Sequence, residues 1–81
     1  MAYMTTTHDY RGYVFIITCA PEDPAYVVDF SDIPDIITSG QTLPEAFHHA
    51  CEALDLHLES LQKLGIPFPS RKHRVFVESA F

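Results

Sequence analysis

The chain has 81 residues, of which 47% are hydrophobic and 12% aromatic, so it is too apolar for a disordered segment and short enough for a single domain over residues 1–81. Eleven acidic residues against five basic ones give a net charge of −6, which excludes a wide basic surface for nucleic acid. No stretch approaches the roughly 18 apolar residues of a membrane span, and the N-terminus lacks a basic segment followed by an apolar one, so we expect a cytoplasmic protein.

The N-terminal half predicts a hairpin. Residues 1–10 are mostly polar, and their structure stays open between a frayed end and an extension of the first strand. Residues 13–19 are β-branched and aromatic on both faces, which is typical of a strand in the middle of a sheet. Two prolines and two acids at 21–24 make a turn, and residues 26–30 return as a second strand. A reversal at 31–35, around Pro34, leads to a short third strand at 36–39.

A long amphipathic helix follows from Thr42 to Gly65. Thr42 and Glu45 form a capping box, Pro44 suits the first turn, and Gly65 before Pro67 is a left-handed stop. At 100° per residue, the apolar side chains fall on one face, which must be buried. That face comprises Leu43, Phe47, Ala50, Cys51, Leu54, Leu58 and Leu61, with Ala46, Ala53, His57 and Leu64 at its margin.

The last predicted strand is Arg74–Glu78, after a connector stiffened by Pro67 and Pro69. The expected fold is therefore α+β, a small two-layer βββαβ sheet with the helix on one face. A right-handed crossover would place the last strand beside residues 13–19, in the spatial order 3-2-1-4. One helix covers one sheet face, so the other face, with several of Val14, Ile16, Tyr26 and Val28 on it, indicates an interaction site or self-association.

The chemistry-bearing residues favour binding over catalysis. Asp29, Asp32, Asp35 and Glu45 are close in sequence, and converging carboxylates of this kind would serve a two-metal nuclease. However, Asp32 and Asp35 are ordinary turn residues, and Glu45 is already used in the helix cap. His48, His49, Cys51 and His57 lack the spacing of a zinc site, and Cys19 and Cys51 are expected to be free. We expect no metal, no cofactor and no catalytic residue.

Three segments together resemble the HicB antitoxin family. Residues 26–35 are similar to its strand followed by "PDLPG", with Ser31 at the first proline and Asp35 at the glycine. Residues 38–47 match its "T-x-G-x-T-x-x-E-A" helix start, and residues 64–70 its "G-x-x-I-P-x-P" helix end. The resemblance spans roughly residues 13–77. It implies the N-terminal, partly formed ribonuclease-H-like domain of that family.

The resemblance also implies a partner and a role. HicB-type proteins bind and neutralise HicA, a small basic toxin that cleaves mRNA, and an acidic chain suits that task. Many members continue into a DNA-binding domain; this sequence ends at Phe81, so we expect none here and do not carry over DNA binding. The candidate partner-binding residues are Asp29, Asp32, Asp35, Tyr26 and Phe30. A homodimer or larger oligomer is expected, and the alternatives are a stand-alone oligomeric domain without a toxin and a metal-dependent nuclease remnant.

Overall fold

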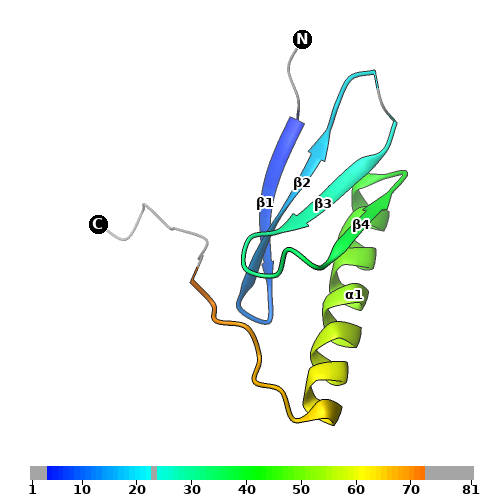
Figure 1. Cartoon of the computed structure of the whole chain (residues 1–81). Coiled ribbons are helices and arrows are strands. Elements are labelled where there is room, and N and C mark those ends of the chain that lie inside the picture. Colours follow the sequence, from blue (N-terminus) through cyan, green and yellow to red (C-terminus); the bar gives the residue numbers. More distant parts are fainter. Residues whose placement is uncertain (1–3, 23, 73–81) are drawn as a thin grey trace.

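A four-stranded antiparallel sheet and one long helix make up the fold. The computed structural model describes residues 4–22 and 24–72. The strands are β1 (Met4–Tyr10), β2 (Tyr13–Cys19), β3 (Tyr26–Phe30) and β4 (Ile37–Gly40), and the helix is α1 (Leu43–Leu64). They lie in the order β1-β2-β3-β4, and α1 packs along one side of the sheet (Figure 1). The predicted two-layer α+β fold is confirmed.

The strand at residues 4–10 corrects the predicted strand order. It pairs with β2 over all seven of its residues, from Met4 opposite Cys19 to Tyr10 opposite Tyr13. Arg11 and Gly12 connect the two strands with φ angles of 55° and 85°, the positive values that a tight two-residue hairpin requires. Because β1 and β3 occupy both sides of β2, the predicted place for the last strand, beside residues 13–19, is wrong. That strand, Arg74–Glu78, lies outside the described residues.

The other predicted strands are confirmed with small changes. Residues 13–19 and 26–30 have the predicted bounds, whereas β4 begins one residue later than predicted, at Ile37. Ile36 instead turns inward from the loop and is 7% exposed. The backbone amide of Ser31 donates to the carbonyl of Val14 at 3.0 Å. The hydrogen bonding to β2 therefore continues one residue past the end of β3.

Both ends of α1 are capped as the sequence predicts. The Thr42 hydroxyl accepts from the Glu45 amide at 3.1 Å, and the Glu45 carboxylate accepts from the Gln41 amide at 2.6 Å, one residue before the position that a capping box would use. At the other end Gly65 has a φ of 71°, and the amides of Gly65 and Ile66 donate to the carbonyls of Gln62 and Leu61. This pattern is a Schellman stop.

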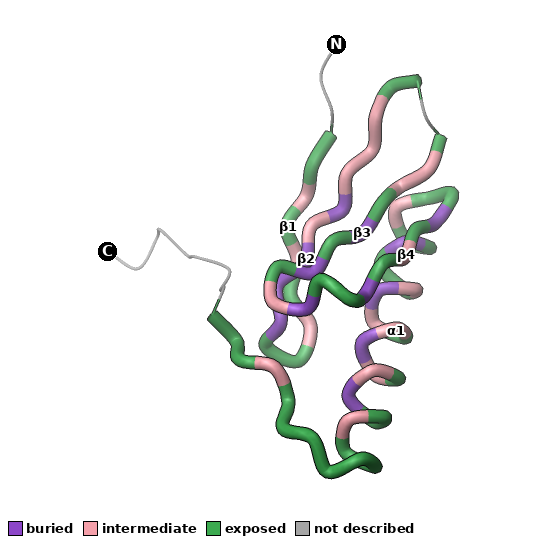
Figure 2. Tube along the Cα trace, viewed as in Figure 1, coloured by how far each residue is buried: buried purple, intermediate pink, exposed green. Residues whose placement is uncertain are grey.

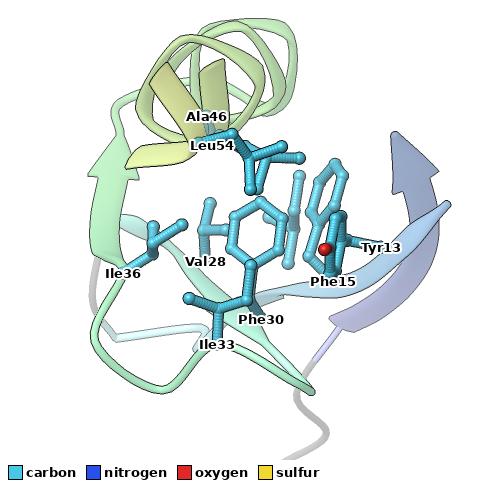
Figure 3. Packing of buried hydrophobic residues seen from close by; sticks show 11 residues of the cluster. Tyr13, Phe15, Val28, Phe30, Ile33, Ile36, Ala46 and Leu54 are labelled. Carbon is cyan, nitrogen blue, oxygen red and sulfur yellow. The ribbon is translucent and has the colours of Figure 1, made fainter. Parts of the chain in front are cut away.

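The hydrophobic core lies between α1 and one face of the sheet (Figure 3). Burial runs along the inner side of the helix, along alternate residues of β3, and over Tyr13, Val14, Phe15 and Ile17 of β2 (Figure 2). The buried cluster comprises Tyr13, Phe15, Ile17, Val28, Phe30, Ile33, Ile36, Ala46, Ala50, Leu54 and Leu58. Among the described residues, no helix is long and apolar enough to cross a membrane.

The buried face of α1 is rotated slightly from the predicted one. Ala46, predicted at the margin, is fully buried, whereas Phe47 is 37% exposed. The reason is the close approach of the helix to β4: a Cβ on Gly40 would lie 2.5 Å from the Ala46 backbone nitrogen. Only a small side chain fits at this contact, so Ala46 turns inward and Phe47 packs at the side.

Candidate partner-binding site

The face of the sheet opposite α1 is a continuous surface, which we call the open face. Strand alternation and the pairing register place ten residues on it. From β1 to β4 these are Thr5, Thr7, Asp9, Val14, Ile16, Thr18, Val27, Asp29, Ile37 and Ser39. Of the four residues predicted for the uncovered face, Val14 and Ile16 lie here, and Tyr26 and Val28 lie on the helix side.

Aliphatic side chains occupy the centre of the open face. Ile37 is 80% exposed and Val27 is 38% exposed, while Ile16 on the neighbouring strand is half-buried. One cross-strand row reads Thr7, Ile16, Asp29, Ile37, and the next reads Thr5, Thr18, Val27, Ser39. The threonines add methyl groups to this surface, so the centre can bury apolar area against another molecule.

The charge of the open face is negative. Asp9 and Asp29 are both exposed on it, and none of its ten positions holds lysine or arginine. Both aspartates lie toward the end of the sheet that carries the 11–12 turn and the 31–36 loop. That loop adds Asp35, which is exposed, and Asp32, which is half-buried. The open face therefore has an acidic end and, around Thr5 and Ser39, a neutral hydroxyl end.

The arginines near the acidic end are held away from the open face. Arg11 forms an ion pair with Asp55 of α1, with Nη1 and Oδ1 3.0 Å apart. The guanidinium of Arg71 lies 4.4 Å from the ring centre of Tyr13, which points toward the helix, and its Nε donates to the Arg11 carbonyl. These contacts keep both positive charges from neutralising Asp9 and Asp29.

Asp55 and Tyr13 also fasten the turn between β1 and β2 to the rest of the fold. The Tyr10 hydroxyl donates to Asp55 Oδ2 at 3.0 Å, and this hydrogen bond raises the pKa of Tyr10 above its ordinary value. The Tyr13 hydroxyl donates to the Pro69 carbonyl at 2.6 Å. The turn is therefore tied both to α1 and to the connector after it, which stiffens the edge of the sheet nearest to Asp9.

The five sequence-predicted site residues do not share one surface. Asp29 lies on the open face, and Asp32 and Asp35 lie in the neighbouring loop. Tyr26 and Phe30 point the other way: Tyr26 packs against the core, and Phe30 is 4% exposed with its ring 4.9 Å from that of Phe15. Sequence reasoning missed Asp9 and Ile37, and the available signal was their alternation with residues that face the helix.

The contacts and burial of His49, Cys19 and Cys51 indicate structural roles. His49 Nδ1 lies 2.7 Å from the Ser39 carbonyl, so this nitrogen carries the proton and donates it to the outer edge of β4. Cys19 and Cys51 do not form a disulfide with each other, and burial raises the pKa of the Cys51 thiol, which keeps it protonated at neutral pH. In the described part of the chain, no group of three or more histidine, cysteine or acidic side chains is placed to hold a metal ion.

These features describe a small α+β domain in which α1 covers one sheet face, while the other face is exposed and acidic. Over 70 residues the chain is 37% identical to antitoxin HicB of Escherichia coli K12, a match that covers 82% of this chain and 50% of the relative. Antitoxin HicB of E. coli O157:H7 matches to the same extent. No protein-family model matches the sequence, and no solved structure matches it significantly.

The chain is therefore similar to HicB antitoxins over most of its length, as the motifs at residues 26–35, 38–47 and 64–70 predicted. It spans about half the length of the curated relatives it matches.

Proposed function

We propose that this chain acts as an antitoxin in the cytoplasm: it binds a small basic toxin of the HicA type, which cleaves mRNA, and neutralises it. The observation that carries the proposal is the 37% identity to antitoxin HicB across 82% of the chain. The net charge of −6 supports it, because an acidic protein meets a basic enzyme faster and covers the surface that the enzyme needs for RNA. The chain itself acts by binding and has no catalytic role in this proposal.

The proposal assigns toxin contact to Asp29 and to the acidic loop that contains Asp32 and Asp35. Tyr26 and Phe30, which pack under the helix, contribute by holding β3 in place. We also propose that the chain self-associates, as a homodimer or larger oligomer, through a surface that leaves Asp29 accessible. The outer edge of the seven-residue strand β1 is suitable because an unpaired strand edge offers backbone groups to another chain.

Growth rescue tests the function directly. The probe is any short basic protein that is encoded beside the gene for this chain, expressed from an inducible promoter in a host that lacks HicA and HicB. We expect its induction to stop growth and degrade mRNA, and co-expression of this chain to restore both. Co-purification of the two proteins then shows that rescue occurs through binding. Toxicity that persists despite abundant co-expressed chain would contradict the proposal.

The same preparation tests the two alternatives. A metal-dependent nuclease would cleave RNA on its own, and its activity would disappear in Asp29→Ala. A stand-alone domain would have no toxic neighbour and would bind none, while forming a defined oligomer by sedimentation velocity. The antitoxin proposal predicts neither RNA cleavage by the purified chain nor a non-toxic neighbour.

A further inference from the structure

We infer that the partner docks on the open face, and that it does so in one orientation. Its lysine and arginine side chains lie over the acidic end marked by Asp9 and Asp29, and its aliphatic side chains cover Ile16, Val27 and Ile37. This inference rests on the proposed function and adds to it the surface, the partner's chemistry and the direction of docking.

The arrangement of exposed apolar side chains supports the open face as the docking surface. Exposed apolar side chains also occur on α1 and after it: Leu56 is 59% exposed, and Leu64, Ile66 and Phe68 are 72%, 48% and 37% exposed. On the open face, by contrast, Ile16, Val27 and Ile37 occupy adjacent strands in adjacent rows. A contiguous patch of this kind can exclude water from a contact. The run after α1 lies between Lys63 and Arg71-Lys72 in the sequence, so its surroundings are positive rather than negative.

The edges of the sheet and the helix are less suitable for a basic partner. His49 donates to the outward carbonyl of Ser39 and so closes part of the four-residue edge of β4. The far end of α1 and the connector after it carry Lys63, Arg71 and Lys72, which repel a positively charged surface. The outer side of α1 carries Glu52 and Glu59 around the exposed Leu56, whereas the open face combines its two aspartates with aliphatic side chains on three adjacent strands and holds no lysine or arginine.

The positions of the two aspartates on the open face determine the direction in which a basic partner docks. Asp29 lies between Ile16 and Ile37 in one cross-strand row, and Asp9 is opposite Val14 in the row nearest to the 11–12 turn. The row at the other end contains Thr5, Thr18, Val27 and Ser39 and has no charge. A partner with cations at one end of an aliphatic strip fits this gradient in one direction only, because the reverse leaves its cations over hydroxyls and Asp29 against apolar groups.

Matched substitutions test the surface. Asp29→Lys on the open face and Glu52→Lys on the outer side of α1 each change the net charge from −6 to −4, and both wild-type side chains are exposed. Ile37→Asp and Leu64→Asp form a second pair, from 80% and 72% exposed positions. Affinity for the neighbouring basic protein is measured by titration calorimetry, with circular dichroism melting of each variant to show that it folds.

We expect Asp29→Lys and Ile37→Asp to weaken binding by about tenfold or more and their controls by less than about twofold, since contacts at the centre of an interface dominate affinity. Equal losses in both pairs would overturn the inference and indicate that net charge alone attracts the partner. Larger losses in Glu52→Lys and Leu64→Asp would place the partner on α1. In both cases the proposed function would stand. If the wild-type chain binds nothing, the function and the inference both fail.

The orientation has its own test. Asp9→Lys and Thr5→Lys both add a lysine to the open face, one at each end of β1. We expect a larger loss of affinity at Asp9 than at Thr5, because only the first meets the partner's cations. A larger loss at Thr5 would reverse the docking direction while keeping the surface.

Discussion

Both faces of β2 carry apolar side chains, but only one of them packs against α1. On the side toward α1, Tyr13, Phe15 and Ile17 are at most 1% exposed and form the centre of the core. On the other side, which no helix covers, Val14 is 6% exposed and Ile16 and Thr18 are half-buried. A strand that is apolar on both faces therefore supplies one face to the core, and the other is the face on which we propose that the partner docks. Each face can be perturbed separately.

The largest expected effect is a difference in unfolding free energy between substitutions on the two faces of β2. Phe15→Ala removes a fully buried ring that contacts Phe30, His8 and Phe47, and it should cost about 3 to 5 kcal/mol of unfolding free energy. Ile16→Ala, its neighbour on the open face, should cost about 1 kcal/mol because that side chain is only half-buried. Urea denaturation measures both. Similar costs would show that the open face is packed against something within the chain.

Alanine substitutions at two glycines test how closely α1 packs against the sheet. In Gly40→Ala the new Cβ meets backbone atoms of Ala46 at 2.5 and 2.8 Å, so α1 must shift away from β4, and we expect a loss of about 1 to 3 kcal/mol. Gly65→Ala has no atom within 4 Å of its Cβ, and only its left-handed φ of 71° costs energy, about 1 kcal/mol. Thermal melting of the two variants measures the difference. A Gly40→Ala variant as stable as wild type would contradict the close helix contact.

A smaller effect is expected where the connector meets the 11–12 turn. Tyr13→Phe keeps the buried ring but removes the hydroxyl that donates to the Pro69 carbonyl, and it should cost about 1 kcal/mol. Tyr26→Phe is the control, because its hydroxyl makes no hydrogen bond within the described residues, and it should be nearly neutral. Urea midpoints of the two variants measure this. An equal effect would indicate that the connector does not hold the turn.

The smallest effect is a pH dependence at Tyr10. Its hydrogen bond to Asp55 raises the pKa of the folded-state phenol above the ordinary value of 10.0, because the neutral form is the donor. The stabilisation is therefore complete below pH 10 and is lost as the pH rises through the folded-state pKa. We expect the stability advantage of wild type over Tyr10→Phe, measured in urea at about pH 8 and about pH 11, to shrink at the higher pH. An advantage that grows with pH would contradict the assigned hydrogen bond.

Local signals made much of the fold predictable. The caps at Thr42 and Gly65 and the apolar runs at 13–19 and 26–30 are short-range features, and each appears in the structure at the predicted place. The strand β1 was not predictable because its threonine-rich sequence has no apolar face and gains its stability only by pairing with β2. Arg11-Gly12 is also not one of the common residue pairs of a two-residue turn.

The candidate site was predictable only in part. Asp29 could be singled out by its charge, but the face on which it lies depends on which parity of β2 and β3 meets the helix. Sequence could not decide this for β2, where Phe15 and Ile16 are both apolar. The close contact of Gly40 with Ala46, which fixes the helix over β4, is a tertiary feature and leaves no pattern along the chain.

The most direct test of the open face is a methyl NMR titration of the wild-type chain with the neighbouring basic protein. Binding at the open face predicts that the methyl signals of Ile16, Val27 and Ile37 shift or broaden, while those of Leu61 and Leu64 at the end of α1 stay unchanged. Perturbation of the leucines, with the three open-face methyl signals unmoved, would contradict the account.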